Sequence, residues 1–347
     1  MLTVRLDEFD YSLPEELIAQ RPLEDRAGAR LLVVDRASGR FEDRSFREFP
    51  EWLRSGDCVV VNNSRVFPAR LYGRRGSGPA RIEVLLARPS EEDAAVWQAL
   101  VRPGRKIRTG EVIEFDGALR AEVIARGEYG ERTLRFSGAT DLLDAFERIG
   151  HVPLPPYIRR ADEPEDHASY QTVYARERGS VAAPTAGLHF TPEMLAQIQR
   201  GTSRQICLEV VPITLHVGPG TFQPVRSEQI DDHRMGRELY EITESAAAAI
   251  RAASRVVAVG TTTVRALEHA ALGGAVEPGR READLFIYPG FEFRVTGALL
   301  TNFHLPRSTL LMLVCAFGGR ELVLEAYAHS VRQRYRFYSY GDCMLLL

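Results

Sequence analysis

Apolar runs and turn residues alternate along the first part of the chain, and their order predicts a β-hairpin, a helix and a buried strand. Apolar residues concentrate at 30–35 and 40–46, on either side of a turn at 37–39, which predicts two paired strands. Residues 46–54 have a helical pattern. The short apolar run at 58–61 that follows has the profile of a buried strand.

A different texture follows, from about residue 66 to residue 136. Short stretches of alternating apolar and polar residues are separated by Gly, Pro and Asp-Gly turns. This pattern is typical of a small antiparallel barrel or sandwich. The expected strands are 82–86, 95–101, 111–115, 119–124 and 133–136.

Beyond a short helix near 141–149, the proline-rich stretch 152–156 fixes extended backbone and marks a boundary. The remainder alternates between helical and strand patterns, as in α/β proteins. The expected helices are 191–199, 245–253, 263–271 and 308–317, and the expected strands are 205–211, 255–259 and 284–287.

The pattern as a whole predicts an α/β fold in which a larger mixed α/β domain carries an inserted antiparallel β-barrel. The larger domain is expected to be discontinuous, made of residues 1–64 and 151–347, with the barrel at 65–150. Neither an internal repeat nor a low-complexity stretch is present, which excludes solenoids and disordered tails.

Composition adds that the chain resembles an ordinary globular protein. Of its 347 residues, 45% are hydrophobic and 26% are charged. The first ten residues lack the apolar core of a signal peptide, and the longest apolar run, 310–317, is too short to span a membrane. We therefore expect a cytoplasmic protein without a membrane segment, and a monomer.

The four cysteines, Cys58, Cys207, Cys315 and Cys343, are widely separated and form no CxxC pair. This spacing supports neither a disulfide framework nor a cysteine zinc site. Three of the four sit beside apolar residues and are expected to be small buried side chains.

The formal net charge of −3 argues against a protein that coats nucleic acid without specificity. The charge is unevenly distributed, because residues 65–135 hold 14 Arg or Lys against 10 Asp or Glu. Lys106 is the only lysine, so the many arginines also reflect a composition bias.

Fingerprints of common nucleotide-binding and hydrolase folds are missing from the sequence, including GxGxxG, the P-loop, HExxH and GxSxG. Four polar, glycine-bearing or histidine-bearing loops instead lie between apolar elements. They are 181–192, 214–222, 256–265 and 299–309.

Each loop also has a purely structural interpretation. The first could be a tight turn that leads into a helix capped by Thr191, and the second a rigid Gly-Pro-Gly turn. The third opens a helix with three threonines, of which N-capping explains one easily, while free amides at such an end attract anions. The fourth could be a satisfied network around Asn302 and His304.

The histidines in these loops favour acid–base chemistry over metal binding. His189, His216 and His304 lack the spacing of zinc ligands, so we expect no metal site. Histidine exchanges protons near neutral pH, and three histidines from three loops could converge on one cleft.

Taken together, the loops resemble one family, the S-adenosylmethionine:tRNA ribosyltransferase-isomerases of queuosine biosynthesis. The likeness runs from end to end of the chain, and any one of its segments alone would be a weak signal. Besides the four loops, it includes 9–11, 17–20, 152–159, 170–174 and 335–342.

The resemblance implies both the fold and the reaction. The fold is a larger α/β domain with an inserted antiparallel barrel. The reaction moves the ribosyl part of S-adenosylmethionine onto 7-aminomethyl-7-deazaguanine at the tRNA wobble position, giving epoxyqueuosine and releasing adenine and methionine. S-adenosylmethionine is then a co-substrate, and no cofactor is expected.

On this basis we assign candidate roles to the loop residues. His189, His216 and His304 are candidates for proton transfer. The candidate substrate-binding residues are Thr185, Gly187, Gly218, Gly220, Thr262, Arg265 and Asn302.

For tRNA, the expected phosphate contacts are basic residues of the inserted barrel and of its exit, although a solvated basic face would have the same composition. They are Arg102, Arg105, Lys106, Arg108, Arg159 and Arg160. The chain departs from the family at Gly236, where members carry a histidine; His233 and Glu238 on either side are present.

Two other classes of function compete with this interpretation. A non-catalytic RNA-binding module would use the loops for recognition only. A methyltransferase that uses S-adenosylmethionine would normally carry a glycine-rich loop after its first strand, and none follows Val61.

Overall fold

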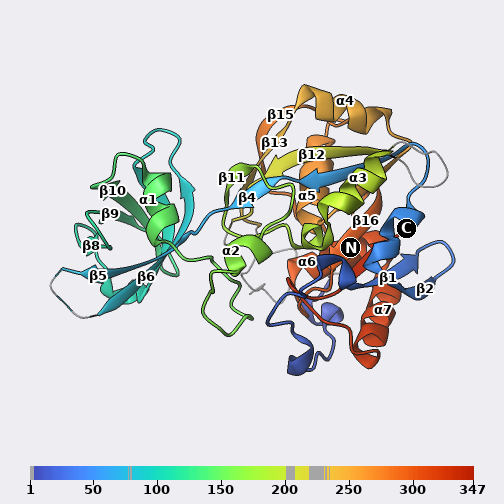
Figure 1. The fold of residues 1–347 in the computed structure, drawn as a ribbon, viewed down its shortest axis with the longest axis horizontal. Coiled ribbons are helices and arrows are strands. Elements are labelled where there is room, and N and C mark those ends of the chain that lie inside the picture. Colours follow the sequence, from blue (N-terminus) through green and yellow to red (C-terminus); the bar gives the residue numbers. More distant parts are fainter. Residues whose placement is uncertain are drawn as a thin grey trace.

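A computed structural model describes residues 4–76, 78, 80–200, 208–218, 230, 233 and 235–347. Figure 1 shows a β-barrel on one side and, on the other, a larger part built on a broad sheet covered by helices. The α/β fold class with an antiparallel barrel is confirmed. The limits at residues 65 and 150 stay a prediction.

Among the described residues, nine strands form the sheet of the larger part, in the order β15-β13-β12-β3-β14-β16-β17-β1-β2. Four neighbouring strands at its centre, β12, β3, β14 and β16, are parallel to one another. The strands are β1 Arg30–Asp35, β2 Arg40–Ser45, β3 Asp57–Asn62, β12 Glu209–Leu215, β13 Glu238–Ile242, β14 Arg255–Val259, β15 Gly279–Ala283, β16 Thr296–Asn302 and β17 Cys343–Leu346.

Apolar side chains cover both faces of this sheet. One core joins the sheet to helices such as α5 and α6, and the other joins it to α3 and to three of the short 3-10 helices, η3, η4 and η6. The α-helices of the larger part are α2 Asp166–Ser169, α3 Pro192–Arg200, α4 Glu244–Ala252, α5 Thr261–Ala270, α6 Thr309–Gly318 and α7 Arg320–Arg332. The 3-10 helices of the larger part are η1 Leu6–Phe9, η2 Glu15–Leu17, η3 Arg26–Gly28, η4 Phe46–Trp52 and η6 Thr185–His189.

The barrel is closed, with six strands among the described residues in the order β10-β7-β6-β5-β8-β9. Inward and outward side chains alternate along them, which explains why the sequence predicted this element. Its elements are β5 Arg70–Arg75, β6 Arg81–Pro89, β7 Val96–Arg102, η5 Gly104–Lys106, β8 Val112–Glu114, β9 Arg120–Arg126, β10 Glu131–Ser137 and α1 Leu142–Ile149.

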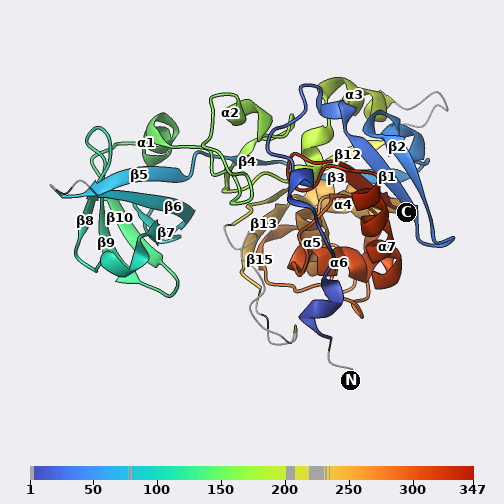
Figure 2. The ribbon, with the colours of Figure 1, turned by 90° about the horizontal axis from the view of Figure 1, so that it is seen from below.

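Two short parallel strands lie between the barrel and the larger part; Figure 1 labels both of them, and Figure 2 shows the first from below. The chain leaves β3 through β4 Ser64–Val66 on its way to the barrel, and it returns through β11 Glu177–Ser180, which pairs with β4. An ion pair between Arg88 and Glu282, with 2.8 Å between nitrogen and oxygen, adds a contact between the barrel and β15.

Most predicted elements of the larger part are present with small shifts, and two of those present differ in bounds or type for physical reasons. The strand expected at 205–211 lies at 209–215 and contains Pro212. The proline has no N–H group, and this position faces away from β3, so no hydrogen bond to β3 is lost. On the other side, β13 pairs only with Thr214 and Leu215. The helix expected at 46–54 is a 3-10 helix that ends at Trp52 and contains Pro50.

The strand expected at 284–287 is wrong. The ladder to β13 ends at Ala283, and the Arg265 side chain donates to the carbonyl oxygens of Ala283 and Leu285, which a further strand would need for pairing. Among the described residues, no helix combines the length and apolar composition needed to cross a membrane.

Candidate active site

The polar loops meet at one edge of the central sheet. Because β12, β3, β14 and β16 are adjacent and parallel, their carboxyl ends lie along the same edge. Ligands of open α/β sheets commonly bind at such an edge. Three of the four loops begin there, at His216 after β12, Gly260 after β14 and Phe303 after β16.

The fourth loop, which contains η6, packs over the same edge. A Cβ atom placed on Gly260 would lie 3.8 Å from the Cβ atom of Ala186. His189 at the end of η6 lies with its Nε2 atom 3.3 Å from Nδ2 of Asn302, the last residue of β16. The structure therefore brings all four predicted loops to one edge.

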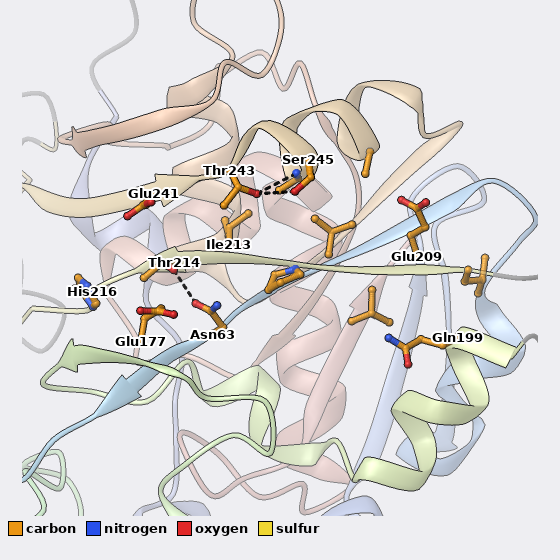
Figure 3. A pocket seen from close by; sticks show the side chains of 16 residues that line it. Asn63, Glu177, Gln199, Glu209, Ile213, Thr214, His216, Glu241, Thr243 and Ser245 are labelled. Carbon is orange, nitrogen blue, oxygen red and sulfur yellow. Dashed lines mark hydrogen bonds between the residues drawn. The ribbon is translucent and has the colours of Figure 1, made fainter.

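His216 marks one end of this edge and borders a groove of about 760 Å³ that runs along β12 (Figure 3). Asn63, Glu177, Glu241 and Thr243 also line the groove, which gives this end an acidic and polar character. Burial lowers the pKa of His216, and its imidazole is neutral at pH 7.

His189 and Asn302 mark the other end of the edge, and both are buried. Burial, with Arg336 and Arg26 nearby, lowers the pKa of His189 to about 4. The Asn302 amide also donates to the carbonyl oxygens of Tyr338 and Asp342, so its nitrogen is a donor, and Nε2 of His189 accepts.

His304 turns back onto its own strand. Its Nε2 atom lies 2.8 Å from Oγ1 of Thr301, its amide donates to the hydroxyl of Tyr327, and its carbonyl oxygen accepts from Tyr11. Burial lowers the pKa of His304 to about 3. These contacts favour a structural role for this histidine.

The three histidines do not line one common pocket among the described residues. His216 borders the groove, whereas His189 and His304 do not line it. The end of β12 is three strand spacings from the end of β16, which is roughly 14 Å at about 4.8 Å per spacing. A ligand in contact with both ends must be elongated.

Five buried polar atoms in these loops, or in residues that contact them, have no hydrogen-bond partner in the described part of the chain. Buried polar groups normally have partners, so such atoms indicate a place where a ligand supplies them. They are Oγ1 of Thr172, the hydroxyl of Tyr174, Oγ1 of Thr262, Oδ1 of Asn302 and the hydroxyl of Tyr338.

Sequence reasoning named Thr262 and Asn302 of this set and missed the other three. A signal was present, because Thr172, Tyr174 and Tyr338 lie inside segments that resemble the family. Gly187 belongs with them, since a Cβ atom on it would lie 2.0 Å from the Tyr174 hydroxyl oxygen. Only glycine allows that approach.

Arg265, a candidate substrate-binding residue, has protein partners for its guanidinium group. Its guanidinium pairs with Glu238 and donates to backbone carbonyl oxygens, with both side chains almost fully buried. Glu238 also accepts from the amide of Gly218 at 3.3 Å. Arg265 and Glu238 therefore hold the loop after β12, and Arg265 has little capacity left for a ligand.

The remaining candidates divide by exposure. Thr185 begins η6 and is partly exposed, while Gly220 lies outside the described residues. Arg102, Lys106 and Arg108 are exposed on the barrel, and the Arg105 side chain is outside the description.

At the barrel exit, two arginines are engaged. Arg159 pairs with Glu15, and Arg160 forms a bidentate pair with buried Asp166 at 2.6 and 2.7 Å. Arg160 also donates to the carbonyl oxygen of Gln20. These bonds favour a structural role for Arg160.

Comparisons with known proteins agree with this arrangement. Residues 6–346 match the family described as queuosine biosynthesis protein. The chain is 58% identical over 360 residues to the S-adenosylmethionine:tRNA ribosyltransferase-isomerase of Solibacter usitatus, with 99% of this chain and 100% of the relative covered. It is 51% identical over 352 residues to the protein of the same name from Symbiobacterium thermophilum, with 99% and 100% covered.

A solved structure is also similar. The crystal structure of S-adenosylmethionine tRNA ribosyltransferase from Thermotoga maritima has a TM-score of 0.54 and 40% sequence identity, and the match covers 98% of this chain and 100% of that one. The end-to-end coverage and the identities show that this chain belongs to the queuosine biosynthesis family of S-adenosylmethionine:tRNA ribosyltransferase-isomerases.

Proposed function

We propose that the protein transfers and isomerises the ribosyl moiety of S-adenosylmethionine onto 7-aminomethyl-7-deazaguanine at the wobble position of tRNA. The product is epoxyqueuosine, and adenine and methionine leave. Family membership and the names of the relatives support the class of reaction. The specific base and product are the finer part of the proposal.

One observation carries the location of the site: unpartnered buried polar atoms lie after β14, at the end of β16 and beside Gly187 of the loop that contains η6. The Thr262 hydroxyl lies at the start of α5, where free backbone N–H groups favour an anion such as the carboxylate of the methionine part. Oδ1 of Asn302 can accept from a donor group of the ligand. An extended donor molecule suits the length of the edge.

The chemistry requires proton transfer at two places. The sulfonium charge acidifies the adjacent C5′ hydrogen, so a base can remove it and start the expulsion of adenine, whose departure protonation assists. The amine of the deazaguanine then attacks the rearranged ribosyl unit, and the epoxide forms as methionine leaves. His189 and His216 are the candidate groups that face the edge, and they are neutral at pH 7 because burial lowers the pKa of each.

For tRNA we propose contact with both the barrel and the edge. The last residue of β3 is Asn62, and the chain passes from there through β4 directly into the barrel, so the carboxyl edge is on the side from which the barrel extends (Figure 1). Arg102, Lys106 and Arg108 on the barrel are exposed and could meet phosphates while the wobble base reaches the edge.

The test is incubation of the protein with S-adenosylmethionine and tRNA that carries the aminomethyl-deazaguanine base. Release of adenine and methionine with formation of epoxyqueuosine is the expected result. S-adenosylhomocysteine would instead indicate a methyltransferase, and binding of tRNA without turnover would indicate an RNA-binding module. Unmodified tRNA is the control and should give no adenine.

A further inference from the structure

A buried serine contacts the ring of His216, and a second buried serine contacts the first. Nδ1 of His216 lies 2.8 Å from Oγ of Ser64, and that oxygen lies 2.6 Å from Oγ of Ser180. Both serines are fully buried. They belong to β4 and β11, the paired strands through which the chain leaves for the barrel and returns from it.

The direction of the hydrogen bonds in this network follows from Ser180, the serine farther from His216. The backbone amide of Val217 donates to Oγ of Ser180 at 2.9 Å, and the one acceptor that the described residues offer to the buried Ser180 proton is Oγ of Ser64. Ser64 then has its own proton to give. Its two possible acceptors are Nδ1 of His216 at 2.8 Å and the carbonyl oxygen of Glu177 at 3.4 Å.

Of the two contacts, only the one to Nδ1 of His216 has the usual length of a hydroxyl hydrogen bond, and we assign the Ser64 proton to it. Nδ1 of His216 therefore accepts a hydrogen bond. A neutral imidazole carries one proton, which must then sit on Nε2. Burial disfavours the charged ring, as described above, so the neutral form is the relevant one.

The packing around the ring leaves Nε2 as the nitrogen that is open to a ligand. A Cβ atom on Gly179 would lie 2.6 Å from both Cε1 and Nδ1 of His216, so only glycine at residue 179 allows the ring to occupy this position. No described residue provides a hydrogen-bond partner for Nε2, and His216 lines the groove beside Glu177 and Glu241 (Figure 3).

We propose that Ser64 and Ser180 are positioning residues that fix His216 as the Nε2–H tautomer, so that it presents a hydrogen-bond donor, and not a base, to the bound nucleoside. Its partner is an acceptor nitrogen or oxygen of the donor molecule. The identity of that ligand rests on the proposed function, whereas the tautomer does not. Removal of the C5′ proton then falls to a group other than His216.

The tautomer is measured directly by long-range ¹H–¹⁵N correlation spectra of the histidine rings in ¹⁵N-labelled protein at pH 7, without substrate. The expected pattern for His216 is a protonated Nε2 and an unprotonated Nδ1. In Ser64→Ala that pattern should give way to a mixture of tautomers. Ser330→Ala, which removes another fully buried hydroxyl from α7, is the matched control and should leave it intact. A wild-type His216 protonated on Nδ1 would overturn the proposal.

Substitutions of His216 separate a donor from a base. The amide nitrogen of glutamine occupies the place of Nε2 and donates a hydrogen bond, but glutamine cannot accept a proton at neutral pH. His216→Gln should therefore keep adenine release within about 10-fold of wild type, while His216→Leu should lose about 100-fold, as expected for one lost hydrogen bond and the unpaired groups left behind. Equal loss in both variants, with both folded, would contradict the donor role.

The two proposals fail in different ways. A wild-type protein with the Nε2–H tautomer that releases no adenine would refute the proposed function and leave the tautomer standing. A wild-type protein that releases adenine but shows the Nδ1–H tautomer would refute the inference and leave the proposed function standing.

Discussion

Glu238 and Arg265 form an ion pair in which the two side chains are only 6% and 5% exposed. The pair links α5 to β13, and through the Gly218 amide it also holds the loop after β12. A buried charge that loses its partner is costly, because the remaining charge is neither solvated nor compensated.

Glu238→Ala should therefore lower the free energy of unfolding by about 3–5 kcal/mol, as measured by urea denaturation at pH 7. The matched control is Glu277→Ala, which breaks the exposed pair with Arg281 and should cost far less, because exposed ion pairs contribute little to stability. A loss for Glu238→Ala that is no larger than the control would show that the pair does not organise this loop.

His304 should make the folded protein sensitive to acid. Its folded pKa of about 3 lies below the value of 6.5 for an unperturbed histidine, because burial disfavours the charged ring. Above pH 6.5 neither state takes up the proton. As the pH falls from 6.5 towards 3, His304 is protonated in the unfolded protein but not in the folded protein. The free energy of unfolding therefore decreases by about 1.4 kcal/mol per pH unit because of this group.

The measurement compares the free energy of unfolding of wild type and His304→Gln between pH 6 and pH 4. The variant should show a slope that is shallower by about 1.4 kcal/mol per pH unit, whatever its absolute stability at pH 8. Parallel slopes would mean that His304 is free to protonate in the folded state.

The exposed basic residues of the barrel should contribute to tRNA affinity without base specificity. Replacing Arg102, Lys106 or Arg108 by alanine removes one phosphate contact each, so the slope of log K against log salt should fall by about 1 for each substitution. Arg332→Ala is the control, since Arg332 is exposed and belongs to α7, a helix that Figure 1 shows on the side of the molecule away from the barrel. Unchanged slopes in all three barrel variants would remove this face from the tRNA contact.

Much of the fold could be predicted because local signals agree with the final structure. Helix α6 begins after the Ser308 cap, whose hydroxyl accepts from the amide of Leu311, and α5 begins after Gly260, which has a positive φ of 92°. The strands of the barrel show the period of two that a closed sheet requires. These features need no knowledge of distant contacts.

Other elements gave no such signal. The strand β17 is fully buried over four residues, and a short apolar run of that kind does not distinguish a strand from part of a helix. The strand β5 contains Gly73 and three arginines, a composition that does not predict a strand. A Cβ atom on Gly73 would lie 2.6 Å from Ile113 of the neighbouring strand. Such requirements appear only when the neighbouring strand is known.

The loops of the candidate site could be predicted from the sequence, but the contacts between them could not. The parallel order of β12, β3, β14 and β16 brings the loops together, and strand order is not encoded locally. The partner of Arg265 lies 27 residues earlier in the chain. Ser64, which contacts His216, and Ser180, which contacts Ser64, lie in segments far from His216 in the sequence. A single serine in a sequence gives no local pattern from which such a contact could be predicted.

The central claim is that the carboxyl edge of these strands binds the donor, and the most direct test is calorimetric titration of S-adenosylmethionine into wild type and Thr262→Val. Valine keeps the shape of threonine and removes a buried hydroxyl that has no partner among the described residues. The free variant should therefore be at least as stable as wild type, while its affinity for S-adenosylmethionine should fall about 10-fold or more for the lost hydrogen bond. An unchanged dissociation constant in the folded variant would contradict the claim.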